Sequence, residues 1–150
     1  MKLLVKFLAI TLFVSFMAAC DDDDDNNNNN TVPNVTYMAT LTAAQEVPPN
    51  TSTATGTSTL IYNPNNRTFN ATTTYTGLSS AVTAGHIHKG AVGVSGPPIF
   101  PFTTLTSPIY YTSGMITTEQ AADLNAGLYY VNIHSATYPE GEIRGQYVRQ

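Results

Sequence analysis

The 150-residue chain has one cysteine, no tryptophan and few charged side chains. A single cysteine cannot form an intramolecular disulfide, so the fold does not depend on a disulfide framework. Five of the ten acidic residues lie in the run 21–25 and two of the six basic residues in the first ten positions, which leaves residues 31–150 with five acids and four bases. This nearly neutral part argues against binding of nucleic acid and against electrostatic attraction to an anionic membrane.

The sequence also lacks the common signatures of hydrolases and transferases. It has no Gly-x-Ser-x-Gly elbow, no phosphate-binding loop and no cysteine nucleophile within residues 31–150. The glycines at positions 85, 90, 93 and 96 do not lead into a predicted helix, so they do not indicate a phosphate cradle. These absences favour a binding module over an enzyme.

Residues 1–19 are typical of a bacterial export signal. Lys2 and Lys6 supply positive charge before an apolar stretch that is too short to span a bilayer comfortably. The segment Met17-Ala18-Ala19-Cys20 resembles a lipobox, in which small residues precede a cysteine that is lipidated and becomes the new N-terminus. We therefore expect lipidation of Cys20, with an ordinary signal peptide that contains a cysteine as the alternative.

Residues 20–34 are expected to form a disordered tether after the lipidated cysteine. The runs of five Asp and five Asn at 21–30 have no apolar side chain to bury. An acidic run at this point also resembles the surface-export signal of Bacteroidota lipoproteins, whereas the simpler interpretations are a solvated spacer or a weak calcium sink. We expect a lipid anchor in the cell envelope, at the outer membrane or cell surface rather than the inner membrane.

From residue 31 onward the composition indicates an all-β domain. Thr, Val, Ile and Tyr are frequent, and Gly, Pro and Asn interrupt them at short intervals, as in a β-sandwich or barrel. Residues 37–43 alternate as a strand does, and the strands 58–62 and 69–75 flank Asn63-Pro64-Asn65-Asn66, which predicts a hairpin. Further strands are expected near residues 82–88, 100–105, 109–116, 128–134 and 142–148.

One short helix is predicted after residue 117. Thr117 and Gln120 have the spacing of a capping box, and Gly127 stands where a C-terminal glycine is expected. About 120 residues in this arrangement can bury enough surface to be stable without disulfides. We therefore expect one all-β domain over residues 35–150, a Greek-key β-sandwich of the superoxide-dismutase-like or immunoglobulin-like type with one short helix.

The three histidines of the chain have an informative spacing. In His86-Ile87-His88 both imidazoles point to one face of a strand and Ile87 to the other, because successive side chains alternate across a sheet. In Val131-Asn132-Ile133-His134 the apolar residues should face the core, which sends His134 to the opposite, polar face. If the two strands are neighbours, the three histidines converge.

Three neutral imidazoles suit copper or zinc, so we expect a metal site at His86, His88 and His134. Glu140, Glu142 and Arg144 follow soon afterwards and are expected to orient the imidazoles or to bind a ligand. The alternative is structural. The histidines would then be hydrogen-bonded groups on a wet sheet face, and the three charged residues a surface cluster that contributes little to stability.

Three motifs, present in order between residues 35 and 150, resemble the CHRD domain, which is named after chordin. They are Leu-Thr-Ala-Ala-Gln-Glu-Val-Pro-Pro at 41–49, Gly-His-Ile-His-Lys-Gly at 85–90, and Tyr-Val-Asn-Ile-His at 130–134 with Pro-Glu-Gly-Glu-Ile-Arg-Gly-Gln at 139–146. The resemblance implies an extracytoplasmic β module of the kind found in chordin and in bacterial secreted proteins. It identifies the fold unit better than an activity.

A second resemblance is to copper/zinc superoxide dismutase, a Greek-key β-sandwich whose copper ligands include a His-x-His pair and a later histidine that ends an apolar strand. His86, His88 and His134 fall on those positions. Residues 96–100 resemble the dismutase Gly-Pro-His-Phe stretch, but Pro98 stands in place of the metal-bridging histidine, and the other zinc histidines and the disulfide cysteines are missing. The resemblance implies a three-histidine copper or zinc site without the bimetallic centre.

These observations favour a lipid-anchored module that binds a protein or glycan partner at the bacterial envelope and holds copper or zinc through the three histidines. The alternative is a copper-dependent redox protein of the superoxide-dismutase-like type. A purely structural adhesin or matrix component is a third hypothesis. The fold alone does not separate them, because one sandwich hosts many functions.

Overall fold

The computed structural model describes residues 31–150. The predicted export signal, Cys20 and residues 21–30 of the tether lie outside the described residues. Of the remaining tether residues, Val32 exchanges two hydrogen bonds with the side chain of Asn65, at 2.9 and 2.7 Å. Within the described part, no helix is long and apolar enough to cross a membrane.

The described chain consists mainly of short antiparallel strands. Its elements are β1 (Val35–Thr42), the 3-10 helix η1 (Ala43–Gln45), β2 (Thr55–Asn63), β3 (Thr68–Thr76), β4 (Val82–Lys89), β5 (Pro98–Pro101), β6 (Ile109–Thr112), α1 (Thr118–Asn125), β7 (Tyr129–Ser135), β8 (Ile143–Gln146) and β9 (Val148–Arg149). This confirms the all-β prediction with one short α-helix.

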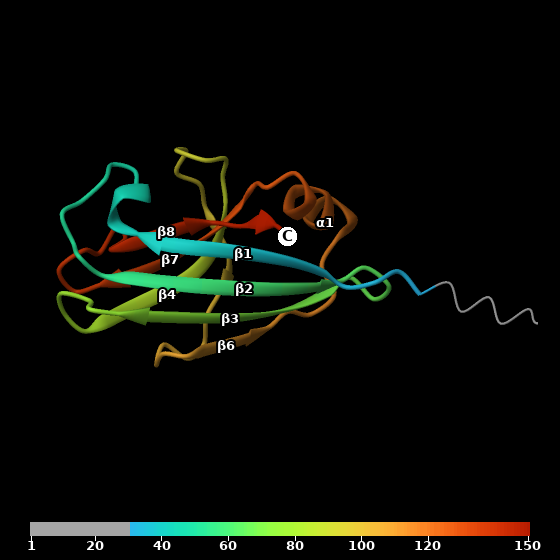
Figure 1. Ribbon diagram of the computed structural model, residues 1–150, viewed down its shortest axis with the longest axis horizontal. Coiled ribbons are helices and arrows are strands. Elements are labelled where there is room, and N and C mark those ends of the chain that lie inside the picture. Colours follow the sequence, from blue (N-terminus) through green and yellow to red (C-terminus); the bar gives the residue numbers. More distant parts are fainter. Residues whose placement is uncertain (1–30) are drawn as a thin grey trace, which may run out of the picture. The chain divides into compact units, whose positions relative to one another are not determined.

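The strands form one antiparallel sheet in the order β5-β4-β7-β8-β1-β2-β3-β6, with β9 paired to β1. The sheet curls, so that β1, β2 and β3 lie in front of β4 and β7 in Figure 1. Phe100 of β5 contacts Phe69 of β3 edge to face at 5.1 Å between ring centroids, which shows that the two ends of the sheet approach each other. The two layers of the predicted sandwich are therefore two halves of one sheet.

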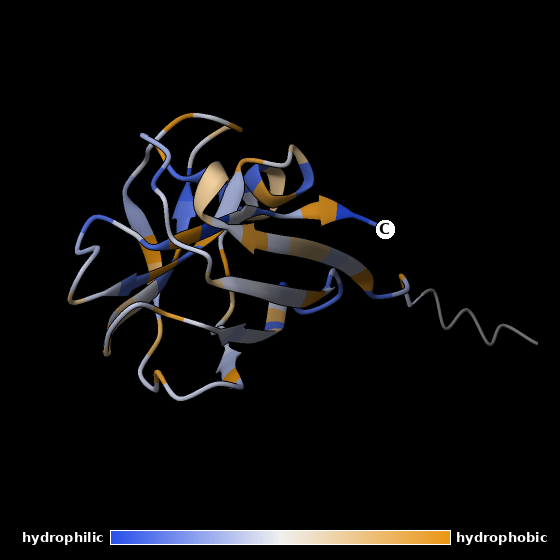
Figure 2. Ribbon diagram, turned by 60° about the vertical axis from the view of Figure 1, so that its left-hand side comes forward, coloured by the Kyte–Doolittle hydropathy of each residue, from blue (hydrophilic) through white to orange (hydrophobic). Residues whose placement is uncertain are grey.

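The core lies between these two halves. Tyr37, Ala39 and Leu41 of β1 are buried, as the alternation in the sequence predicted, and they pack in one cluster with Ile87 of β4 and Ile133 of β7. In Figure 2 orange and paler residues alternate along the strands. Since each buried aliphatic side chain contributes about 1.5–3 kcal/mol, this shared core fixes which face of each strand points outward.

The predicted helix is confirmed together with its capping box. The Thr117 hydroxyl accepts a hydrogen bond from the Gln120 amide at 3.1 Å, and the Gln120 side chain accepts one from the Thr117 amide at 2.9 Å. Gly127 has a φ of 70° after the helix, a conformation that glycine adopts without strain.

Two strands are shorter than predicted. The segments expected at 100–105 and 109–116 are the four-residue strands β5 and β6. Prolines stand at both ends of β5, and because proline has no amide hydrogen it limits the hydrogen-bonded ladder at this edge of the sheet.

Candidate functional site

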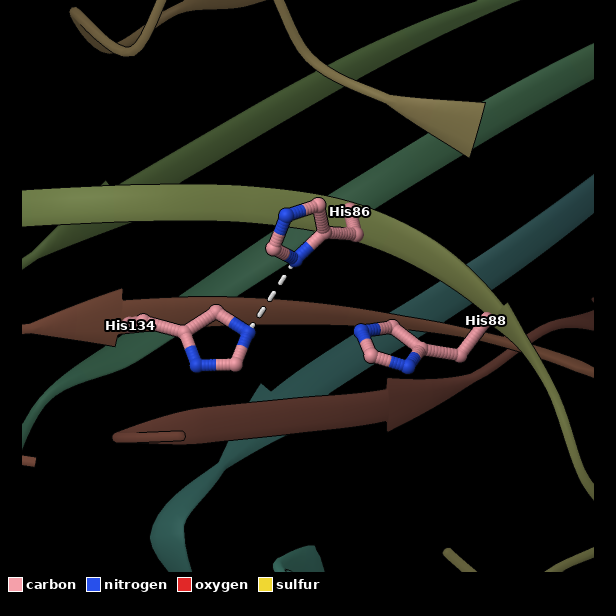
Figure 3. Close-up of side chains that lie close together, drawn as sticks. All are labelled: His86, His88 and His134. Atoms are coloured by element: carbon pink, nitrogen blue, oxygen red, sulfur yellow. Dashed lines mark hydrogen bonds between the residues drawn. The ribbon is translucent and has the colours of Figure 1, made fainter. Parts of the chain in front are cut away.

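The three histidines converge because β4 and β7 are neighbours. In their antiparallel register Ala84 pairs with His134, and His86 pairs with Asn132. Ile87 and Ile133 enter the core, so all three imidazoles project from the opposite face of the sheet. One potential ligand nitrogen from each histidine lies within 4.8 Å of the other two (Figure 3).

Hydrogen bonds fix the orientation of two of the rings. His88 Nδ1 donates to the carbonyl oxygen of Gly96, and His134 Nδ1 donates to that of Pro139, both at 2.9 Å. Because a carbonyl can only accept, these bonds place the ring proton on Nδ1 and leave Nε2 as the lone-pair nitrogen in each neutral imidazole. His134 Nε2 accepts from His86 Nδ1 at 3.2 Å, shown as the dashed line in Figure 3.

The histidines are not on a wet surface. His88 and His134 are 7% and 8% exposed, because loops close over this face of the sheet, and His86 is half-buried. Burial lowers the pKa of all three imidazoles, that of His88 to about 4. At neutral pH they are therefore uncharged, which is the form in which imidazole binds a metal.

A buried aromatic side chain separates this cluster from the predicted Arg144. The Tyr130 ring stacks on His88 at 4.8 Å between centroids, and Arg144 Cζ lies 3.5 Å from the Tyr130 ring centroid. Arg144 Nη2 also donates to the carbonyl oxygens of Ala91 and Val94, both at 3.0 Å. Arg144 thus holds the loop that follows β4, and the Tyr130 ring contacts both its guanidinium group and the His88 ring.

The two predicted carboxylates lie in different environments. Glu140 is exposed, whereas Glu142 is fully buried and accepts hydrogen bonds from Ser52 Oγ at 2.6 Å and from the Ser79 amide at 2.8 Å. Within residues 31–150 neither of them hydrogen-bonds a histidine. The backbone carbonyls of Gly96 and Pro139 orient the imidazoles instead.

Sequence reasoning missed a further buried carboxylate, Glu46, which follows η1. It is 6% exposed; its Oε2 accepts a long hydrogen bond of 3.4 Å from Asn132, and its Oε1 has no partner among the described residues. Burial raises the pKa of Glu46 to about 7, although Arg144 and Asn132 partly oppose this. The one signal in the sequence was an isolated acid within the otherwise uncharged motif at 41–49.

Comparison with known proteins supports one of the two resemblances. The family model of the CHRD domain matches residues 37–147, a range that contains all three motifs. No curated protein and no solved structure matches the chain. The predicted resemblance to the CHRD domain is therefore confirmed.

Proposed function

Because the chain belongs to the CHRD-domain family, we propose that it is a binding module of the bacterial envelope that holds one copper or zinc ion through His86, His88 and His134. In this proposal a lipid on Cys20 anchors the module at the outer membrane or cell surface, and a protein or glycan is its partner. The family supports the binding role, and the histidine geometry supports the metal.

The unpartnered Nε2 of His88 carries the metal proposal. This atom is buried and has no hydrogen-bond partner among the described residues, although most buried polar atoms in proteins have one. In Figure 3 it faces the other two histidines. The opposite ring nitrogen donates to a backbone carbonyl, an arrangement that is common for metal-binding histidines because it fixes the tautomer.

The ligand geometry fits after a small adjustment. Three nitrogens at about 2.0–2.1 Å from one ion lie about 3.5 Å from one another. His86 Nδ1 and His134 Nε2 are already 3.2 Å apart, so the widest separation of 4.8 Å has to close by about 1.3 Å. Neutral imidazoles suit copper and zinc alike.

Metal analysis of the purified mature protein tests the proposal. After dialysis we expect one equivalent of copper or zinc, and calorimetric titration of the metal-free protein should give one site. His88→Gln should weaken binding strongly, whereas Glu140→Gln, a change at a nearby exposed side chain, should not. Binding that persists when all three histidines are replaced by alanine would contradict the proposal.

The number of ligands favours a second candidate function, a copper-dependent redox protein of the superoxide-dismutase-like type. Three protein ligands leave a coordination position open, as catalytic metal sites generally do. The test is superoxide disproportionation by the copper-loaded protein. Activity no higher than that of the triple-alanine variant leaves the binding module as the function.

A further inference from the structure

A cavity of about 400 Å³ lies next to Arg144. It is lined by the segment that follows β1, by the loop after β4 and by β8. None of the three histidines lines it. The cavity is therefore a site distinct from the candidate metal centre.

Two opposite charges line this cavity without forming an ion pair. Glu46 is 6% exposed and Arg144 only 2%, yet no nitrogen of Arg144 lies within 4.0 Å of a Glu46 oxygen. Among residues 31–150, Lys89 makes the ion pairs, with Glu119 and Asp123. Buried charges destabilise a protein unless they are paired. A third group that lies between Glu46 and Arg144 and contacts both would reduce this cost.

Both charged groups also have unused hydrogen-bonding capacity. Glu46 Oε1 is buried without a partner among the described residues. Among residues 31–150, Arg144 donates hydrogen bonds only from Nη2. Its Nε and Nη1 therefore have no acceptor among these residues. The site thus offers an acceptor oxygen on one wall and cationic donors on another.

The remaining walls are mostly apolar. The cavity is lined by Val47, Pro49 and Val92, and all three side chains are exposed. Val92 is 78% exposed and Val47 39%. An aliphatic part of a ligand would remove these side chains from water.

We propose that this cavity binds a small zwitterion with an aliphatic side chain, such as an α-amino acid. Its ammonium group donates to Glu46, its carboxylate accepts from Arg144, and its side chain lies against Val47, Pro49 and Val92. The proposal does not depend on metal binding, because it uses no histidine.

Charge complementarity selects this ligand class. A simple cation would be repelled by Arg144, and a simple anion by Glu46. A neutral sugar could form hydrogen bonds here but would leave both charges uncompensated. The volume is at the small end of ligand cavities, which extend from about 300 to 1,000 Å³, and suits a single amino acid.

The test is a titration of the isotopically labelled mature protein with L-leucine, followed through the backbone amide signals of Val47 and Val92. Two analogues of similar shape test the contribution of each charged group of leucine. Isocaproate lacks the ammonium group, and isoamylamine lacks the carboxylate. We expect leucine to shift both signals saturably and each analogue to bind at least about ten-fold more weakly. This comparison uses only the unmodified protein.

Substitutions then assign the effect to the cavity. Glu46→Gln should weaken leucine binding at least about ten-fold, whereas Glu140→Gln, a matched change at an exposed carboxylate, should leave it unchanged. The proposal is overturned if leucine at about 10 mM causes no shift, if the analogues bind as well as leucine, or if glucose shifts these signals and leucine does not.

Discussion

Replacing Glu46 by glutamine should stabilise the domain at alkaline pH and have little effect in acid. The side chain is buried with one oxygen unpartnered, and burial raises the pKa of its carboxyl from 4.5 to about 7. The folded state therefore favours the protonated form. This contribution to stability is fully present below about pH 4.5 and is lost as the pH rises through 7.

The pKa values set the size of the effect. A pKa about 2.5 higher in the folded than in the unfolded state corresponds to about 3 kcal/mol, because each pH unit is worth about 1.4 kcal/mol. Above pH 8 the ionised Glu46 costs the domain this free energy. Glutamine has nearly the same shape and stays neutral, and its amide oxygen can still accept from Asn132.

Urea unfolding of both proteins at about pH 4.5 and about pH 8.5 measures the effect. Since the chain has nine tyrosines and no tryptophan, tyrosine fluorescence or circular dichroism serves as the signal. The stability gained by Glu46→Gln should be about 3 kcal/mol larger at the higher pH. Titration of the buried histidines occurs in both proteins and cancels in the difference.

The exposed Glu140→Gln provides the control and should show no such pH-dependent gain. If Glu46→Gln and the unmodified domain have parallel stability profiles between these pH values, Glu46 is not destabilised by its surroundings in the way described. The cavity would then lack the unpaired charge that the proposed ammonium group contacts.

Three further outcomes are expected. Metabolic labelling with a fatty acid should mark the wild-type protein but not Cys20→Ser, and equal labelling of both would refute the lipoprotein assignment. Deletion of residues 21–30 should leave the melting temperature unchanged, since a tether without apolar side chains buries no surface, and a large decrease would mean that the segment packs on the fold. Gly145→Ala should destabilise the domain by about 1–3 kcal/mol, because the new Cβ would lie 2.6 Å from the carbonyl oxygen of Thr40, whereas Gly114→Ala, with nothing within 4 Å, should not.

Much of the histidine cluster could be predicted because strand periodicity is a local property. Alternation in two short segments placed Ile87 and Ile133 in the core and the imidazoles on the other face, as the structure has them. The adjacency of β4 and β7 was the one condition that periodicity could not supply. The capping box at Thr117 was equally predictable, since all its hydrogen bonds lie within four residues.

The environment of that cluster could not be predicted in the same way. Periodicity assigns a side chain to a face of the sheet, but it does not say what covers the face. The structure buries Tyr130 and Arg144 under the loop after β4, which is distant from both residues in sequence. Glu46 had no pattern to identify it, because its burial depends on the packing of η1 and the following residues against β8.

The loop after β4 explains why the covered face is polar and yet ordered. Gly96 of this loop accepts from His88, and Ala91 and Val94 accept from Arg144, so buried side chains at two positions hold the same loop through its backbone carbonyls. Backbone acceptors do not depend on the loop's own side chains, which leaves Val92 free to face the cavity. The loop after β4 therefore contacts both the proposed metal site and the proposed zwitterion site, but the two sites have no ligand-binding residue in common. Consequently, His88→Gln and Glu46→Gln should each affect one site, and a loss of both functions in either variant would indicate displacement of the loop rather than loss of a ligand.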